Sequence, residues 1–265
     1  MQLFVTGSPR SGMTIVTQYL NRHHDIEVFD EIDLIQVVRS GGRVMSTLQP
    51  FLIERGVYES YHRRAVETAD PALALRATMS ELARPCTVWG EKNPRYATQL
   101  GALRHSFPGA AVLFVLRDPR EVVNSCLAHR GSLARTPLDF WIKDTVAEAL
   151  ALVERHLEPL EAVVPDVAVL RYEAFVARPE ATLDAALGRW GLSFSAGPGP
   201  VDPVVPETAA DHQFFRDGAP LPWKLGNLSP LCLAPRVRDR IDADDPVWAR
   251  VDALARRFGY GSASC

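Results

Sequence analysis

The sequence predicts an α/β fold of three layers, in which a central parallel sheet lies between two layers of helices. Short apolar or β-branched runs alternate with longer helix-compatible segments, and parallel strands require such crossover segments between them. A glycine turn at residues 7–14 also follows the first apolar run and precedes a helical pattern. That order of strand, glycine turn and helix is typical of phosphate-binding loops, so the expected fold is P-loop-like.

The strands are expected where apolar and β-branched residues run together. Residues 112–116 are apolar throughout, as expected of a central strand covered on both faces. Asp118-Pro119 is typical of a helix start, since a capping residue precedes proline in the first turn. The expected strands are 3–6, 87–89, 111–116 and 167–170, and the expected helices are 13–22, 60–84, 94–105, 119–130, 138–158, 179–191 and 245–258.

The composition is that of a soluble globular protein. Of 265 residues, 47% are hydrophobic and 23% are charged, and the net charge of −3 provides no basic field for nucleic acid. The apolar runs are much shorter than the roughly 18 to 20 residues of a membrane span. The first strand begins almost at the amino terminus, with no secretory leader before it. We therefore expect a cytoplasmic protein with no nucleic-acid partner and no membrane span.

The length favours a single domain over residues 1–265. Residues 197–235 differ from the rest because eight prolines interrupt them, which prevents long helices. Surface segments of this kind often form lids or binding loops, so we expect a lid there. The sequence does not decide the oligomeric state, and a homodimer is left open.

Cysteine and histidine spacing does not indicate a metal site, and no metal is expected. The four cysteines form no CxxC pair, so we expect them to be reduced and to serve packing. His23 and His24 are adjacent at the end of the first expected helix. Because adjacent helical side chains do not face each other, a capping or surface role is favoured over a ligand pair.

The glycine turn can build an anion site from backbone N–H groups and the positive end of a helix dipole. P-loop nucleotide hydrolases have a lysine after the second glycine, where this chain has Met13. The nearest cation within the loop is Arg10, whose planar guanidinium suits oxyanions. The loop can therefore bind phosphate but lacks the lysine that holds a γ-phosphate.

A second candidate site follows the expected strand 111–116. Arg117 lies just past its carboxyl end, where ligands bind in open α/β sheets. Ser125 follows eight residues later, about two helical turns into the next helix. The two side chains could meet one phosphate if that helix folds back beside the loop. Alternatively, Arg117 pairs with Asp118 or Glu121, as surface ion pairs commonly do.

Two further segments carry charge near the expected sheet edge. Lys92 follows a strand and precedes a pre-proline turn, so it could project into the crevice with the arginines, or it could be a surface lysine. An acidic cluster spans residues 27–33. Glu31 or Asp30 could accept a proton from an attacking hydroxyl if this stretch returns to the carboxyl edge of the sheet. The alternative is a solvated acidic face.

Together these segments resemble the sulfotransferases that use 3′-phosphoadenosine 5′-phosphosulfate (PAPS). In that family a P-loop-like turn binds the 5′-phosphosulfate, and an arginine and a serine eight positions apart bind the 3′-phosphate. The turn here is similar to the family's PRSGTT form, with Met13 in place of the usual threonine. The resemblance covers about residues 2 to 180. It implies nucleotide contacts from Arg10, Ser11, Gly12, Met13, Thr14, Ile15, Arg117 and Ser125.

The resemblance is closer to the bacterial and tyrosylprotein-type branches than to the classical cytosolic branch. Those branches have a glutamate base after the first helix, and Glu31 is at the matching position. Lys92 is similar to their strand-end lysine, which stabilises the transferring sulfuryl group. Tyr172 resembles a tyrosine that contacts the nucleotide, and Lys224 has a weaker likeness to a C-terminal cofactor-binding loop.

The resemblance implies in-line transfer of a sulfuryl group from PAPS to a hydroxyl or amine, with Glu31, Lys92 and Arg10 as catalytic residues. The acceptor would be a small molecule, a carbohydrate or a natural product. The absence of the P-loop lysine is consistent with PAPS as the donor, because PAPS has no γ-phosphate. The alternatives are a P-loop kinase or hydrolase that uses ATP, and a non-catalytic nucleotide-binding protein of the same fold. Aromatic residues such as Phe51 and Tyr61 could shape the acceptor pocket or belong to the core.

Overall fold

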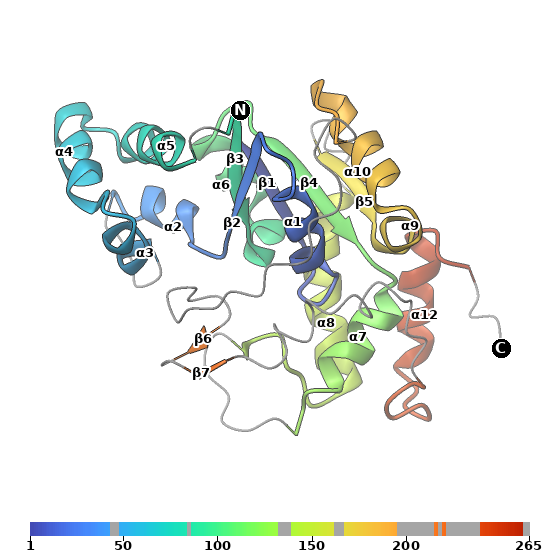
Figure 1. The fold of residues 1–265 in the computed structure, drawn as a ribbon. Helices are drawn as coiled ribbons and strands as arrows, with labels where there is room; N and C mark the ends of the chain where they lie inside the picture. Colours follow the sequence, from blue (N-terminus) through green and yellow to red (C-terminus); the bar gives the residue numbers. More distant parts are fainter. Residues whose placement is uncertain are drawn as a thin grey trace.

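The structure of the chain, a computed structural model, contains a five-stranded parallel sheet with helices on both faces (Figure 1). The strand order is β2-β3-β1-β4-β5, so β1 pairs with β3 on one side and with β4 on the other. The expected three-layer, P-loop-like α/β fold is confirmed. In such sheets ligands bind at the carboxyl ends of the strands, where the strand order reverses. The strands are β1 (Leu3–Gly7), β2 (Ile26–Asp30), β3 (Val88–Lys92), β4 (Ala111–Leu116) and β5 (Val167–Arg171).

The expected lid at 197–235 lies largely outside the described part of the chain. Within it, β6 (Phe215–Arg216) and β7 (Ala219–Pro220) pair antiparallel. Among the described helices, none is long and apolar enough to cross a membrane. The structure describes residues 1–42, 48–83, 86–131, 139–161, 167–194, 215–216, 219–220 and 239–261.

Two apolar clusters, one on each face of the sheet, form the core. Because successive strand residues point to opposite faces, Phe4 joins one cluster while Leu3 and Val5 join the other. The second cluster is covered by α1 (Met13–Leu20), α9 (Tyr172–Ala177) and α10 (Pro179–Leu187). The first cluster is covered by α2 (Leu34–Arg39), α3 (Leu48–Glu54), α4 (Tyr58–Thr68), α5 (Pro71–Leu82), α6 (Leu100–Ser106), α7 (Pro119–Leu127), α8 (Val146–Leu157) and α12 (Trp248–Arg257).

The edge strand β2 was not predicted from the sequence. Its residues were interpreted only as part of an acidic cluster, because carboxylates are depleted in strands. Val28 and Phe29 are buried, and every residue of β2 pairs in register with β3. Asp30 therefore ends its strand directly beside Lys92. The short helices α2, α3 and α9 were also missed.

The expected helix at 60–84 is two helices. Ala69 ends α4 in a left-handed conformation, and Pro71 begins α5. The side chain of Asp70 accepts hydrogen bonds from the N–H groups of Ala72 and Leu73, which caps the second helix. The apolar pattern continues across this break, so periodicity alone did not reveal it.

Two other expected helices have different bounds. The segment expected at 94–105 begins with a 3₁₀ helix, Pro94–Thr98, before α6. The helix expected at 138–158 begins only at Val146, because Thr145 and Glu148 form a reciprocal capping box.

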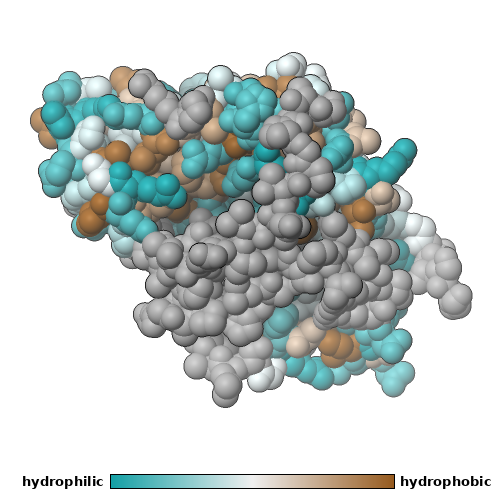
Figure 2. Space-filling model, viewed as in Figure 1, coloured by the Kyte–Doolittle hydropathy of each residue, from teal (hydrophilic) through white to brown (hydrophobic). Residues whose placement is uncertain are grey.

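The surface over α3, α4 and α5 mixes hydrophilic and hydrophobic residues (Figure 2). Ile53, Val66 and Leu73, one on each of these helices, are large apolar side chains with substantial exposure. Scattered exposure of this kind is ordinary on a folded protein and indicates no particular partner.

Gly90 allows β3 to approach β1 closely. A Cβ atom at this position would lie 1.6 Å from the carbonyl oxygen of Leu3. We predict that Gly90→Ala lowers the free energy of unfolding by about 3 kcal/mol, since overpacking a tight core displaces the backbone. Urea denaturation measures the change.

The matched control is Gly101→Ala on α6, where a Cβ atom meets nothing within 4 Å. Alanine there should raise stability by roughly 0.5 to 1 kcal/mol, because glycine is the poorer helix former. Equal effects of the two substitutions would contradict the close approach at Gly90.

Candidate active site

The glycine turn joins β1 to α1 at the carboxyl edge of the sheet. Gly12 ends the turn with φ 94°, and a Cβ atom there would lie 2.3 Å from the ring of Tyr172. Glycine is required at this position for both its positive φ and its missing side chain. The close packing brings Tyr172, at the start of α9, against the loop predicted to bind the nucleotide.

The loop has the properties of an anion site. The Ser8 and Ser11 hydroxyls are buried, and within the described part of the chain they have no hydrogen-bond partner. The first N–H groups of α1, at residues 13–15, have no acceptor within the helix. No acidic side chain lies in its first turn. Unpartnered donors and the positive end of the dipole therefore suit an oxyanion such as phosphate or sulfate.

Met13 is part of the core. Its side chain is 5% exposed and packs in the apolar cluster of α1, α9 and α10. Ile15 is buried in the same cluster, so only its backbone could contact a ligand. The position after the second glycine thus contributes packing, which gives a physical reason for an apolar residue there.

Arg10 and Ser125 meet across the loop. The Nε of Arg10 donates a hydrogen bond to Ser125 Oγ at 3.1 Å. The guanidinium lies 4.6 Å from the ring centre of Trp141, a cation–π contact. His129 packs edge-on against the same indole. Sequence reasoning missed Trp141, because it is distant in the chain from Arg10 and belongs to no motif.

Arg117 faces the same loop. Its guanidinium donates to the carbonyl oxygen of Arg10 at 3.1 Å and lies 5.0 Å from the ring centre of Tyr172. It also contacts Glu121 at 3.4 Å, which is one of the alternatives considered for this arginine. Asp118 pairs instead with Arg120. Arg10, Arg117, Ser125 and Tyr172 are therefore linked by direct contacts, whereas Lys224 lies outside the described residues.

A partly buried carboxylate, that of Glu173, holds the loop that carries Arg117. Glu173 accepts a hydrogen bond from the N–H of Asp118 and another from the hydroxyl of Tyr260, both at 2.9 Å. Burial, followed by the charge of Glu173, raises the pKa of Tyr260 well above its ordinary value. Tyr260 follows α12, so the C-terminal region helps to fix the β4–α7 loop.

Lys92 is not a surface residue. Its side chain is 2% exposed and forms ion pairs with Asp30 and, at 2.6 Å, with Glu31. Burial lowers the pKa of Lys92, but the two carboxylates outweigh that effect and raise it above its ordinary range. The ammonium therefore stays charged. The acidic stretch does return to the carboxyl edge of the sheet, because β2 runs parallel to β3.

The two carboxylates that pair with Lys92 differ in their exposure to solvent. The side chain of Asp30 is 7% exposed, whereas that of Glu31 is 40% exposed. Glu31 follows β2 with φ 53° and donates its N–H to the carbonyl oxygen of Lys92. Of these two, Glu31 is the carboxylate that an incoming molecule can reach.

Glu91, the residue before Lys92, was missed by sequence reasoning. It is fully buried and accepts hydrogen bonds from the backbone N–H groups of Asp33 and Leu34, at 2.8 and 3.0 Å. The side chains of Asn93 and Tyr96 donate two more. Burial raises the pKa of Glu91 to about 7, although these two side-chain hydrogen bonds oppose the shift.

Two aromatic residues that could have shaped the acceptor pocket, Phe51 and Tyr61, belong to the core. Phe51 packs edge-on against Phe29, and Tyr61 is completely buried. Tyr61 also donates its hydroxyl hydrogen to the carbonyl oxygen of Gly42. These side chains therefore hold α3 and α4 against the core.

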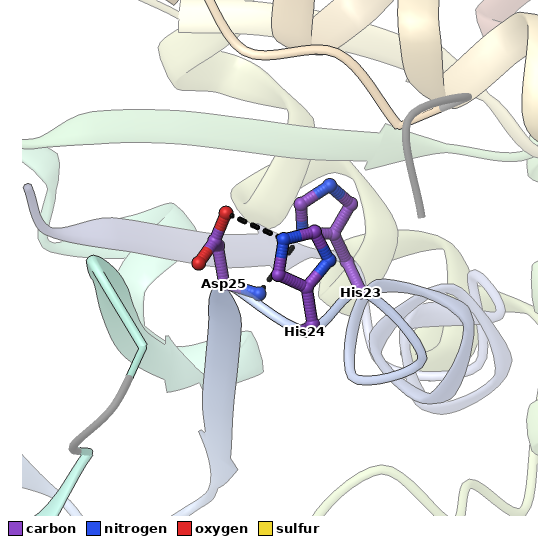
Figure 3. A group of neighbouring side chains, drawn as sticks. All are labelled: His23, His24 and Asp25. Carbon is purple, nitrogen blue, oxygen red and sulfur yellow. Dashed lines mark hydrogen bonds and ion pairs between the residues drawn. The ribbon is translucent and has the colours of Figure 1, made fainter. Parts of the chain in front are cut away.

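His23, His24 and Asp25 form a separate cluster at the turn between α1 and β2 (Figure 3). The Nδ1 atom of His23 accepts the N–H of Asp25 at 3.1 Å, and its Nε2 lies 3.1 Å from the carbonyl oxygen of Ser193. His24 pairs with the Asp25 carboxylate at 3.0 Å. Both ring nitrogens of His23 are thus engaged in holding the turn.

A protein-family comparison decides the family. The model described as "Sulfotransferase family" matches residues 2–196, well over half of the chain. The chain belongs to the sulfotransferase family. No curated protein shows significant sequence similarity to it.

Two solved structures are similar to this sulfotransferase over nearly its whole length. The sulfotransferase domain of the Synechococcus PCC 7002 olefin synthase is 17% identical with a TM-score of 0.63, over 99% of this chain and 96% of that one. The sulfotransferase domain from the curacin biosynthetic pathway is 16% identical with a TM-score of 0.60, over 98% and 97%. At these identities the likeness is one of fold.

The raised pKa of Glu91 predicts a pH-dependent stability. Between its ordinary pKa of 4.5 and about 7, the folded protein retains a proton that the unfolded chain has lost. The contribution of Glu91 to the free energy of unfolding should therefore be greatest below about pH 4.5 and decline as the pH rises to about 7. Asp33 and Tyr96, which face this carboxylate, remain in both proteins compared.

Urea denaturation of the wild type and of Glu91→Gln across this pH range isolates the effect. The difference between the two proteins should change with pH, because glutamine does not titrate. A constant difference would contradict the raised pKa.

Proposed function

We propose that this sulfotransferase uses PAPS and transfers its sulfuryl group to a hydroxyl or amine of a small-molecule, carbohydrate or natural-product acceptor. The observation that carries the proposal is the pairing of the reachable carboxylate of Glu31 with the buried ammonium of Lys92. The pair stands at the carboxyl edge of the same sheet as the glycine loop. A base and a cation are therefore available beside an anion site, as group transfer from an anionic donor requires.

The donor would be held by two groups of residues. The backbone of residues 11–15, the hydroxyls of Ser11 and Thr14 and the guanidinium of Arg10 would bind the 5′-phosphosulfate. Arg117 and Ser125 would bind the 3′-phosphate, with Tyr172 beside the nucleotide. The unpartnered hydroxyl of Ser11 and the direct contacts among the two arginines, the serine and the tyrosine support this assignment.

When bound, PAPS supplies a sulfuryl group joined to phosphate in an anhydride. A bond forms between the acceptor oxygen or nitrogen and sulfur, and the bond between sulfur and the bridging oxygen breaks. Glu31 takes the acceptor's proton, and adenosine 3′,5′-bisphosphate leaves. Lys92 and Arg10 stabilise negative charge on the sulfuryl and bridging oxygens.

Asp30 has a distinct role in this scheme. It is buried against Lys92, so it does not compete with Glu31 for the acceptor. When Glu31 takes a proton, Lys92 loses the negative charge of one partner but retains the other. Asp30 therefore keeps the ammonium charged and in place through the transfer.

The acceptor class is the part of the proposal that the two solved relatives bear on. One comes from an olefin synthase and the other from the curacin biosynthetic pathway. We therefore rank natural-product hydroxyls first among the acceptors to test. The proposed enzyme acts in the cytoplasm.

An ATP-dependent kinase receives no comparable support, because the buried Met13 occupies the position of the phosphate-binding lysine.

Glu31→Gln should lower turnover by roughly 10²- to 10⁴-fold, because the amide cannot accept the acceptor's proton. Its affinity for adenosine 3′,5′-bisphosphate should stay close to that of the wild type. Steady-state kinetics and thermal shift measure the two quantities. Glu27→Gln, near the start of the strand that Glu31 follows, is the matched control and should keep wild-type turnover. Full activity of Glu31→Gln would exclude Glu31 as the base.

Arg117→Ala should weaken binding of adenosine 3′,5′-bisphosphate by roughly 10- to 150-fold, the loss expected for a charged hydrogen bond. Binding of adenosine 5′-monophosphate, which lacks the 3′-phosphate, should change far less. Titration calorimetry with both nucleotides measures the ratio. Arg130→Ala removes an exposed arginine paired with Asp242 and should leave both affinities unchanged. An equal loss for the two nucleotides would rule out a 3′-phosphate contact.

A further inference from the structure

Glu91 and Lys92 are consecutive residues at the carboxyl end of β3. Successive strand side chains point to opposite faces, so the two reach different parts of the neighbouring segment. Lys92 contacts the side chains of Asp30 and Glu31. Glu91 instead contacts the backbone just beyond Glu31. One strand end therefore holds the same short segment in two ways.

The segment that Glu91 holds has an unusual backbone. Glu31 and Asp33 both have positive φ, at 53° and 60°, and such conformations of non-glycine residues persist only where neighbouring structure maintains them. Asp33 precedes α2 but makes no side-chain cap to it. Glu91 provides that function from another strand, since Oε1 accepts the N–H of Asp33 and Oε2 accepts the N–H of Leu34.

Two further side chains fix the Glu91 carboxylate. Asn93 donates to Glu91 Oε1 at 3.0 Å and to the Asp33 carboxylate at 2.8 Å. Tyr96 donates its hydroxyl hydrogen to Glu91 Oε2 and accepts the N–H of Ile35 at 3.3 Å. With the two backbone groups, four donors converge on one buried carboxylate.

We infer that Glu91 is a positioning residue for Glu31: it fixes the turn that follows Glu31, and so sets where the proposed base lies relative to Lys92. The inference rests on the proposed function of Glu31. Glu91 itself is completely buried and cannot reach an acceptor. Its effect on catalysis is therefore exerted through the backbone of residues 31–34.

Glu91→Gln is the informative change. At a pH above about 7 the Glu91 carboxylate is ionised and only accepts hydrogen bonds. Glutamine has the same shape but replaces one acceptor oxygen with a donor group, which then opposes either the backbone N–H groups or the side-chain donors. The turn should relax toward ordinary backbone angles and displace Glu31. A displacement of about 1 Å at a reacting group can cost on the order of 10²-fold in rate.

The matched comparison is Glu173→Gln. Glu173 also accepts one backbone N–H and one tyrosine hydroxyl, but it does so beside Arg117. A stability control is Leu183→Ala, a core truncation in α10 on the opposite face of the sheet from α2. It should lower the free energy of unfolding without moving the turn after Glu31, which packs on the other face.

Three measurements on each variant test the inference: amide hydrogen exchange, kcat with PAPS, and affinity for adenosine 3′,5′-bisphosphate. In Glu91→Gln, we expect the amides of Asp33 and Leu34 to exchange at least about 10-fold faster. We also expect kcat to fall by roughly 10- to 100-fold while nucleotide affinity stays within about twofold. Glu173→Gln should instead weaken nucleotide binding and leave those two amides protected. Leu183→Ala should leave those two amides protected and preserve kcat at saturating PAPS.

The inference is overturned if Glu91→Gln leaves these amides protected, or if they are released while kcat stays at the wild-type value. It is also overturned if kcat and nucleotide affinity fall together in Glu91→Gln. A joint loss of that kind is the result expected of general unfolding. A wild-type chain that transfers no sulfuryl group from PAPS overturns the proposed function instead. The exchange data identify that case, because they do not depend on turnover.

Discussion

The ion-pair cluster at the carboxyl end of β3 is the constraint on which the candidate site depends. Lys92 is almost completely buried, and a buried ammonium is tolerated only with compensating charge. Asp30 and Glu31 supply that charge from the adjacent strand. β2 must therefore pair with β3 in the observed register, because a shift of one residue would turn Asp30 to the other face.

The same strand end links the two halves of the site. β3 pairs with β1 as well as with β2, and Lys92 is opposite Val5 of β1. β1 continues directly into the glycine loop, where Arg10, Arg117 and Ser125 are in contact. The sheet thus carries the cation–carboxylate pair and the anion loop on neighbouring strands. Their relative position is fixed by backbone pairing rather than by flexible segments.

Both halves are supported by a glutamate that accepts backbone hydrogen bonds, fully buried in the case of Glu91 and partly buried in that of Glu173. Glu91 accepts backbone N–H groups beyond Glu31, and Glu173 accepts the backbone N–H beyond Arg117. Each is also bound by a tyrosine hydroxyl, from Tyr96 and Tyr260 respectively. Loops at the site are therefore held by side chains other than those proposed to contact the donor.

Local patterns in the sequence were sufficient to predict most of the sheet, and they also indicated the candidate site residues. The glycine loop, the spacing of Arg117 and Ser125, and a lysine at a strand end each depend on a few neighbouring residues. β2 was missed because carboxylates occupy two of its five positions. The roles of Glu91 and Glu173 could not be predicted, because their partners depend on tertiary packing. Tyr260, for example, is 87 residues from Glu173 in the chain.

The most direct test of the account is to identify the group that the chain transfers. The wild-type protein is incubated with ³⁵S-labelled PAPS, and in parallel with γ-³²P-labelled ATP and Mg²⁺, against a panel of natural-product, phenolic and carbohydrate acceptors. The account predicts that ³⁵S moves to an acceptor, with an equal amount of adenosine 3′,5′-bisphosphate released. Transfer of ³²P from ATP with no movement of ³⁵S would contradict it.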